Sequence, residues 1–428
     1  MSEPVYFLNL EIKNYRCFKD KQVLDLSDGK GNWRKWTVIL GDNGMGKSTI
    51  LQLLASSEIR ERVLENGEIR YGPTRRSLKP IPPLSGEIPG FFKVGLNIFY
   101  EQSENRFSET LRVSFSNNKE RIHLHNDIRL KNLKCFGYGA NRKMGISSLS
   151  SSTGFNSESL FNEDERLINA EEWLLQLDYA ASKDSELKNF AINKRKQVME
   201  ILIDLLPDVS EISFTKPTKE NLKSSVEFLT PFGLISIHQL SLGYKTMVTW
   251  IVDLAARMFE RYSDNDNPLA EPAIVLVDEI DLHLHPKWQR KIFDYLSDKF
   301  PKTQFIVTAH SPLIVQSAPR NANIVLLRKE GDRVVIDNDL KSVNNWRLDQ
   351  ILTSDLFGLD SARGKEAEEK LKERKELLAK EKLSKKERDR LNELNFFANS
   401  LPTAYNHEDI EAMSIVQEAA EYLKNKKK

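Results

Sequence analysis

The segment GDNGMGKS at residues 41–48 constrains the fold more than any other part of this 428-residue chain. It matches the pattern G-x-x-x-x-G-K-[ST]. A β-branched apolar run at 37–40 precedes it, and a helix-forming apolar run at 49–55 follows it. Strand, glycine loop and helix are the context in which this pattern binds phosphate. The sequence therefore predicts a phosphate-binding loop (P-loop) after a buried strand, and this context argues against a plain glycine turn.

The residue types of the P-loop predict its chemistry. Glycines let successive backbone N–H groups face one anion, and the start of the following helix adds partial positive charge. Lys47 is expected to pair with the β- and γ-phosphates of a nucleotide, and Ser48 to ligate Mg²⁺. The predicted nucleotide-binding residues in this segment are Asn43, Gly44, Gly46, Lys47, Ser48 and Thr49.

A second segment, IVLVDEIDLHLHP, packs five potential metal ligands into eight positions: Asp278, Glu279, Asp281, His283 and His285. Taken alone, this cluster could form a zinc or di-iron site. A P-loop protein, however, needs an acidic residue at the end of a buried strand. Residues 273–277 are continuously apolar, as a central parallel strand is. We therefore predict that Asp278 holds Mg²⁺, that Glu279 polarises the attacking water, and that the two histidines form no separate zinc site.

A third segment, LSLG at 240–243, precedes an amphipathic helical pattern. The motif alone is weak evidence, because Ser241 would cap a helix on any interpretation. Its order is more informative: P-loop, L-S-x-G, apolar strand with Asp-Glu, then TAHSP at 308–312. In this order the chain resembles the ABC-type ATPases. NYRCF at 14–18 and the motif DEIDLHLHP are similar to the SMC, RecF and OLD group, and within it to the PtuA family of Septu antiphage defence.

The resemblance implies an α/β fold: an ABC-type P-loop NTPase with a mixed sheet, a helical lobe and a C-terminal helical appendage. It also implies two ATP molecules held between two subunits, with Ser241 and Gly243 binding the γ-phosphate from across the interface. Residues 281–286 would form the D-loop between the two sites. His310 would be the switch histidine at the γ-phosphate; the alternative is a strand-end histidine without a role. The expected catalytic residues are Glu279, His310 and Lys47.

One part of the family pattern is not obvious in this chain. The Q-loop glutamine, which helps to ligate magnesium, should follow a strand that leads into the helical lobe. The segment NLKCFGYGANR looks like that strand and places Asn141 or Arg142 at the position. Gln102 is a rival, although it lies in a polar stretch. The sequence leaves these alternatives open.

The overall composition excludes several classes of protein. The chain has 63 Lys+Arg against 62 Asp+Glu, so no global basic field compels binding to nucleic acid, although a local contact remains possible. Cys17 and Cys135 are not spaced as a ligand pair, which argues against a disulfide scaffold or a Cys-rich zinc module. A signal pattern and an 18-residue apolar run are both lacking, so we expect a cytoplasmic protein without a membrane partner.

Changes of composition predict the domain organisation. A Pro/Gly-rich stretch at 71–90 is typical of a surface loop, and a Ser-rich stretch from residue 147 is typical of a mobile linker. The sequence lacks a long heptad arm, which argues against a chromosome-bridging SMC protein. We predict four parts. The first is an ATPase part with the P-loop (1–140), and the second is a linker and helical lobe (141–210). The third is an ATPase part with the L-S-x-G signature, the acidic strand end and His310 (211–340), and the fourth is a helical appendage for docking or oligomerisation (341–428).

The predicted appendage is rich in charge. Residues 363–390 are nearly all charged or aliphatic, and Ser384 with Glu387 forms a capping-box pattern, so two helices should meet near Leu383. A last helix is predicted at 407–423. If the appendage docks a partner, the expected anchors are Leu391, Leu394, Phe396 and Phe397.

Three functions remain as hypotheses at this stage. The first is an ATPase that dimerises, or forms a higher homo-oligomer, around ATP and regulates a partner in antiviral defence. The chain lacks a recognisable nuclease constellation, so that partner is expected to be a separate nuclease, possibly of HNH type. The second is a RecF-like clamp whose binding to DNA depends on ATP and falls with salt. The third is an ABC transporter motor, which would require a membrane partner and a conventional Q-loop.

Overall fold

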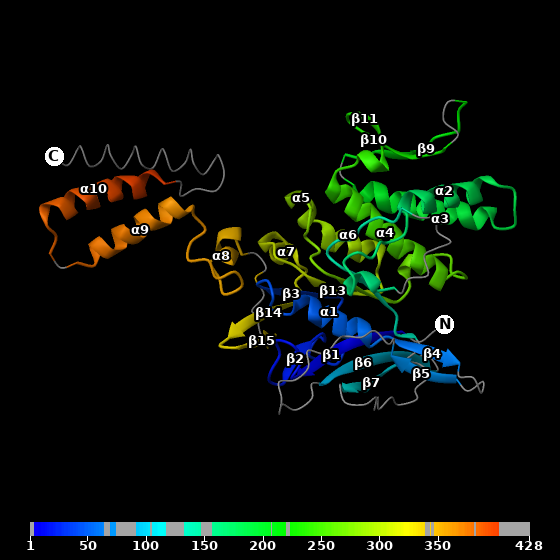
Figure 1. The fold of residues 1–428 in the computed structure, drawn as a ribbon, viewed down its shortest axis with the longest axis horizontal. Helices are drawn as coiled ribbons and strands as arrows, with labels where there is room; N and C mark the ends of the chain where they lie inside the picture. Colours follow the sequence, from blue (N-terminus) through cyan, green and yellow to red (C-terminus); the bar gives the residue numbers. More distant parts are fainter. Residues whose placement is uncertain are drawn as a thin grey trace. The chain divides into compact units, whose positions relative to one another are not determined.

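A computed structural model describes residues 4–63, 69–73, 91–102, 105–116, 132–146, 156–206, 208–219, 223–338, 343, 346–380 and 382–401. The chain divides into two compact units, Met1–Ile351 and Leu352–Lys428. Figure 1 shows the strands and most helices in the first unit and a helical hairpin in the second. Among the described residues, no helix is both long and apolar enough to cross a membrane.

A six-stranded sheet forms the centre of the first unit, in the order β15-β14-β3-β13-β12-β8. Five strands run parallel and β15 pairs antiparallel with β14, which makes the sheet mixed. The central strands β12 and β13 are buried at every residue, as expected for a sheet covered on both faces. The strands are β3 (Trp36–Gly41), β8 (Cys135–Tyr138), β12 (Ala273–Val277), β13 (Thr303–Thr308), β14 (Asn323–Glu330) and β15 (Arg333–Asp337).

The strand and helix predicted around the P-loop are confirmed as β3 and α1 (Lys47–Ser56). The strand predicted at 273–277 is confirmed as β12. Phe7 and Leu10 of β1 lie in the same buried cluster as Leu51 and Leu54 of α1. This packing anchors the helix that begins at the P-loop.

A second sheet lies on the α1 side of the unit, in the order β2-β1-β6-β7 (Figure 1). Its strands pair antiparallel, and β4 and β5 form a separate antiparallel hairpin. The strands are β1 (Val5–Lys13), β2 (Gln22–Asp25), β4 (Ile59–Val63), β5 (Ile69–Pro73), β6 (Phe91–Gln102) and β7 (Asn105–Ser116).

Helices α2 and α3 lie within residues 141–210, and a three-stranded sheet β11-β10-β9 precedes the long helix α4. Strands β10 and β11 pair antiparallel as a hairpin around Pro231, Phe232 and Gly233. The bounds are α2 (Ala170–Ser182), α3 (Lys188–Leu205), β9 (Glu211–Phe214), β10 (Val226–Thr230), β11 (Gly233–Ser236), α4 (Leu242–Arg261), α5 (Pro286–Gln289), α6 (Ile292–Lys299), α7 (Pro312–Ser317) and α8 (Leu348–Leu352), with 3₁₀ turns at Glu158–Leu160, Ile237–Gln239 and Pro268–Ala270.

The second unit contains α9 (Lys365–Leu378) and α10 (Lys385–Ser400). The capping box predicted at the start of α10 is confirmed, since Ser384 and Glu387 bond each other's backbone N–H. One predicted anchor is wrong: Leu394 is only 2% exposed, because it packs inside the unit. Phe396 is 78% exposed. The predicted last helix at 407–423, most of the loop at 71–90 and the start of the linker at 147 lie outside the described residues.

Candidate functional site

The candidate site lies at one edge of the central sheet. Strands β3, β13, β12 and β8 are parallel neighbours, so their carboxyl ends meet at the same edge. The P-loop follows β3, His310 follows β13, Asp278 follows β12, and Arg142 lies four residues after β8. The topology thus brings together segments that are more than 200 residues apart in the sequence.

The P-loop holds its lysine among its own carbonyls. The Lys47 Nζ donates to the carbonyl oxygens of Gly41 at 2.7 Å and Asp42 at 3.0 Å. Burial lowers the pKa of Lys47, and the nearby carboxylates of Asp278 and Glu279 oppose this shift. In P-loop proteins, the lysine at this point of the motif reaches the phosphates of the nucleotide.

Gly44 and Gly46 of the loop both have a positive φ, and of these two only Gly46 also has close neighbours. Gly44 has φ of +80° and faces open space. Gly46 has φ of +90°, and a Cβ there would lie 2.6 Å from the Cys17 Sγ and 2.9 Å from the Phe18 ring. The segment with NYRCF therefore packs directly under the loop. Asn43 is exposed at the loop surface.

A chain of short hydrogen bonds links the P-loop to the end of β12. The Ser48 hydroxyl donates to Asp278 Oδ2 at 2.6 Å, and the Thr308 hydroxyl donates to Asp278 Oδ1 at 2.6 Å. The same Thr308 oxygen accepts the backbone N–H of Glu279 at 2.7 Å. Glu279 itself has φ of +50°, in the left-handed region. Both oxygens of the buried Asp278 carboxylate are therefore oriented by hydroxyl groups.

His310 faces the acidic turn. Its Nε2 lies 4.0 Å from Glu279 Oε1, and its backbone N–H donates to Asp281 Oδ2 at 3.0 Å. Both the imidazole and the Glu279 carboxylate are partly exposed. The structure thus brings together Glu279, His310, Lys47, Ser48 and Asp278, as the sequence predicts.

The two other histidines of the acidic segment have local contacts. The carbonyl oxygen of His283 lies 2.3 Å from where a Gly243 Cβ would be. His285 caps α5, its Nδ1 accepting the Lys287 N–H at 3.3 Å. In the part of the chain that the structure describes, no group of three or more His, Cys, Asp or Glu residues is placed to hold a metal ion.

The L-S-x-G segment lies beside residues 283–285 of its own chain. Ser241 caps α4 and accepts the Tyr244 N–H at 3.4 Å. Ser241 and Gly243 line a small cavity of about 70 Å³ together with His283, Leu284 and His285. Leu242 is 62% exposed. Since Ser241 is exposed as well, the start of α4 faces outward.

Two arginines contribute contacts that the sequence motifs did not assign. The Arg16 guanidinium donates to Thr49 Oγ1 at 2.8 Å and Gln52 Oε1 at 3.0 Å, so it lies beside the first turns of α1. Its position within N-Y-R-C-F was the available signal. Arg142 donates to the backbone carbonyls of Asp278 at 2.7 Å and Glu279 at 2.9 Å.

The Q-loop candidates take different positions. The Asn141 side chain donates to the Glu163 carbonyl at 3.1 Å, away from Asp278. Arg142 contacts the main chain of the acidic turn, and its guanidinium has no acceptor atom for a metal. The side chain of Gln102 lies outside the described residues.

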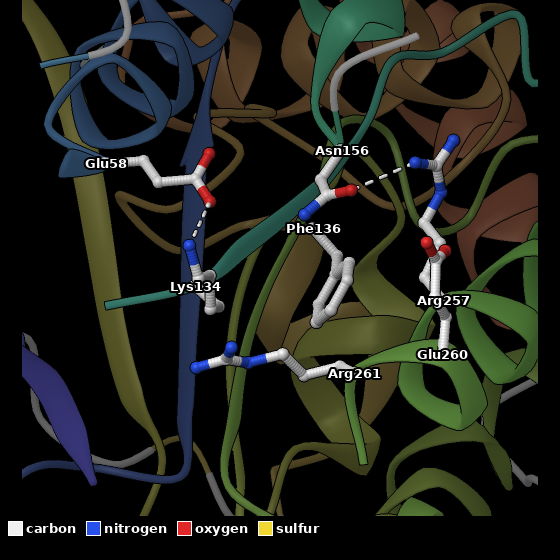
Figure 2. Close-up of a pocket in the computed structure, with 7 residues that line it drawn as sticks. All are labelled: Glu58, Lys134, Phe136, Asn156, Arg257, Glu260 and Arg261. Carbon is white, nitrogen blue, oxygen red and sulfur yellow. Dashed lines mark hydrogen bonds and ion pairs between the residues drawn. The ribbon is translucent and has the colours of Figure 1, made fainter. Parts of the chain in front are cut away.

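A cavity of about 490 Å³ lies elsewhere (Figure 2). Lys134 precedes β8, so the cavity is at the opposite edge of the sheet from the P-loop. Two of its cations have acidic or amide partners: Lys134 Nζ lies 3.9 Å from Glu58 Oε1, and Arg257 bonds Asp253 at 2.6 Å and Asn156 at 3.0 Å. This cavity contains none of the residues that the sequence motifs predict for nucleotide binding.

Residues 36–316 match the profile of a protein family described as AAA domain, putative AbiEii toxin, type IV TA system. This match covers more than half of the chain. The chain belongs to this AAA-domain family. The P-loop, the signature, the acidic strand end and His310 all fall within the matched residues.

The chain is also similar to proteins named for the Septu and retron systems. It is 28% identical to the Septu protein PtuA of Bacillus mycoides (strain KBAB4), over 82% of this chain and 44% of that protein. It is 36% identical to the retron Vc95 probable ATPase of Vibrio cholerae serotype O1 biovar El Tor, over 31% of this chain and 25% of that protein. The chain thus spans less than half the length of these relatives. The predicted resemblance to the PtuA proteins is confirmed.

Solved structures with a similar fold include SMC head domains. The SMC head domain from Thermotoga maritima is 15% identical, with a TM-score of 0.41, covering 80% of this chain and all of that one. An SMC head bound to the C-terminal winged-helix domain of ScpA is 18% identical, with a TM-score of 0.42, covering 78% and 97%.

Proposed function

We propose that this AAA-domain protein binds and hydrolyses ATP as a sandwich dimer and thereby regulates a separate nuclease in antiviral defence. The observation that carries the ATPase proposal is the pair of hydrogen bonds from Ser48 and Thr308 to the Asp278 carboxylate. They join the P-loop, the acidic strand end and the strand that leads to His310 at one edge of the sheet.

The residues at this edge fit a magnesium ion. The Ser48 hydroxyl and the Asp278 carboxylate are oxygen donors 2.6 Å apart, beside the loop that would hold phosphates, and Mg²⁺ prefers such donors in nucleotide sites. When bound, the ion would neutralise charge on the β- and γ-phosphate oxygens of ATP. Lys47 would exchange its carbonyl partners for the phosphates.

The acidic turn supplies the groups for hydrolysis. Glu279 lies one residue beyond Asp278 and is partly exposed, so its carboxylate can accept a proton from an attacking water. His310, 4.0 Å from that carboxylate, can donate a hydrogen bond to the γ-phosphate. Hydrogen-bond donors preorganised toward developing charge are a large source of rate enhancement.

The outward-facing signature supports the dimer. Leu242 is exposed although it is a large apolar residue, and Ser241 beside it is exposed at the start of the 20-residue helix α4. A helix N-terminus with free N–H groups is suited to bind an anion. A second copy with its P-loop facing this surface would complete both sites by two-fold symmetry.

A mixing experiment tests the sandwich dimer. Lys47→Ala and Ser241→Arg chains are each expected to lose hydrolysis, whereas their mixture should recover about a quarter of the wild-type rate. The reason is statistical: about half of the dimers are mixed, and each holds one intact site out of two. The measurement is phosphate release after the chains are exchanged.

A matched mixture serves as the control. Lys47 and Glu279 lie on the same side of each proposed site, opposite the partner's L-S-x-G segment. A mixed dimer of Lys47→Ala and Glu279→Gln therefore has both sites damaged, and this mixture should stay inactive. Recovery of hydrolysis in this control would contradict sites shared between subunits. So would a lack of recovery in the first mixture, provided that the wild-type protein hydrolyses ATP.

We propose a separate nuclease as the partner because the chain resembles the PtuA family of Septu antiphage defence. We infer that the second unit holds this partner, since α9 and α10 belong to a separate compact unit and Phe396 is exposed. Deletion of the residues after Gly364 is therefore expected to leave ATP binding intact and abolish co-purification with the nuclease.

A point variant sharpens this prediction. Phe396→Asp should weaken co-purification at least tenfold, because a truncated aromatic anchor typically costs more than about 1–2 kcal/mol. Leu378→Asp, at the exposed end of α9, is the matched control and should have a small effect. Nuclease still bound to the deleted chain would place the docking surface elsewhere.

A further inference from the structure

Arg142 is a buried arginine directly behind the acidic turn. It is only 3% exposed, and its guanidinium donates in two directions, to the Asp278 carbonyl at 2.7 Å and the Glu279 carbonyl at 2.9 Å. A planar guanidinium is suited to hold two acceptors in a set geometry, which a point-like ammonium is not.

Arg142 is one of several groups that hydrogen-bond the backbone of Asp278 and Glu279. The Asp278 N–H donates to the Tyr138 carbonyl at 2.8 Å, as the last bond between β12 and β8. The Glu279 N–H donates to Thr308 Oγ1 at 2.7 Å. The two carbonyls accept from Arg142, and the Glu279 carbonyl also accepts the Leu282 N–H at 3.0 Å, so every backbone polar group of Asp278 and Glu279 has a partner. On one side, Thr308 at the end of β13 holds the turn. On the other side, Arg142 in the segment after β8 holds it.

The turn needs this support because it is strained. Glu279 has φ of +50°, a conformation that costs a residue with a Cβ on the order of 1–2 kcal/mol. Such strain persists only when the surroundings over-determine it. The left-handed residue redirects the chain after β12, which brings the Glu279 carboxylate to 4.0 Å from the His310 imidazole.

Burial of this arginine is costly for the fold. Removal of a cation from water carries a large desolvation penalty. Burial lowers the pKa of Arg142 to about 10, although the charges of Asp278, Glu279 and Asp281 oppose the shift. Its Nε has no hydrogen-bond partner among the described residues. The fold accepts this cost at the place where the guanidinium holds both carbonyls of the acidic turn.

We propose that Arg142 is a positioning residue for hydrolysis, which holds the Asp278–Glu279 turn so that Glu279 points at the attacking water. This inference rests on the proposed ATPase function. Arg142 carries only N–H donors, so it acts on the protein main chain and not as a replacement for the metal-binding glutamine of a Q-loop.

The test compares Arg142→Ala with wild-type protein in the full chain. ATP affinity should stay within several-fold, because the P-loop is untouched, while kcat should fall on the order of 10², as for a displaced catalytic group. Guanidinium at millimolar concentration should restore part of kcat, because it can bridge the same two carbonyls. Methylammonium should restore less, and Arg142→Lys should retain less than a tenth of kcat.

A second, half-buried arginine provides the matched control. Arg257→Ala, at the opposite edge of the sheet, should lower the melting temperature but leave kcat of the folded protein near wild type, without a guanidinium effect. If kcat and melting temperature fell together in both variants and guanidinium did not restore kcat, Arg142 would have only a structural role.

A crystal structure of Arg142→Ala makes the proposal independent of activity. Glu279 is expected to leave the left-handed region and its carboxylate to move away from His310. An unchanged turn would overturn the positioning role even if hydrolysis is measurable. Conversely, wild-type protein that binds and hydrolyses no ATP would refute the proposed function, while the crystal structure would still decide whether Arg142 sets the turn.

Discussion

Glu279→Gln is expected to bind ATP with wild-type affinity and to lose about 10²–10⁴ in kcat, the usual cost of removing a general base. Glutamine keeps the size of the side chain but accepts a proton poorly. The backbone of residue 279 is held by Thr308 and Arg142, so the substitution should not move the turn. The side chain is partly exposed, so stability should change little.

The measurement pairs equilibrium ATP binding with steady-state phosphate release. Glu163→Gln, which changes an exposed glutamate outside the acidic turn, is the matched control and should keep kcat. Lys47→Ala should lose ATP binding itself, which separates the two roles. Hydrolysis by Glu279→Gln at the wild-type rate would assign the base elsewhere.

Gly46→Ala is expected to lower the free energy of unfolding by about 2–5 kcal/mol and to abolish ATP binding. With φ of +90°, an alanine at this position is strained by about 1–2 kcal/mol. Its Cβ would also lie 2.6 Å from the Cys17 Sγ and 2.9 Å from the Phe18 ring, and overpacking of this kind costs about 1–3 kcal/mol. The loop must therefore move, and α1 begins at the next residue.

The control is Gly44→Ala in the same loop. Gly44 has a similar φ of +80°, but nothing lies within 4 Å of its Cβ position. Only the backbone strain of about 1–2 kcal/mol should remain. Chemical denaturation without nucleotide compares the two variants. Equal losses of stability would show that contact with the NYRCF segment does not matter.

The P-loop and the acidic strand end were predictable because each motif is local. A buried parallel strand reads as a continuous apolar run, and 37–40 and 273–277 are such runs. The carboxyl ends of parallel strands meet at one edge, so the proximity of Ser48 and Asp278 followed without a structure. The capping box at Ser384 is local in the same way.

Contacts that depend on long-range packing were not predictable. Leu394 was expected to be an exposed anchor, but an apolar stripe on a helix does not say which of its members the neighbouring helix covers. The role of Thr308 required the placement of β13 between β3 and β12. The sequence also left Asn141 and Arg142 as equal candidates for one function.

The sequence by itself determined which chemical groups meet at the proposed nucleotide site, since motif glycines, Lys47, Ser48, Asp278 and Glu279 follow from spacing along the chain. Only the tertiary structure decided how the acidic turn is held. Arg142 reaches it across 136 residues of sequence, and Thr308 from the other side. Side-chain partners of this kind depend on strand order and register, which no local pattern of residues encodes.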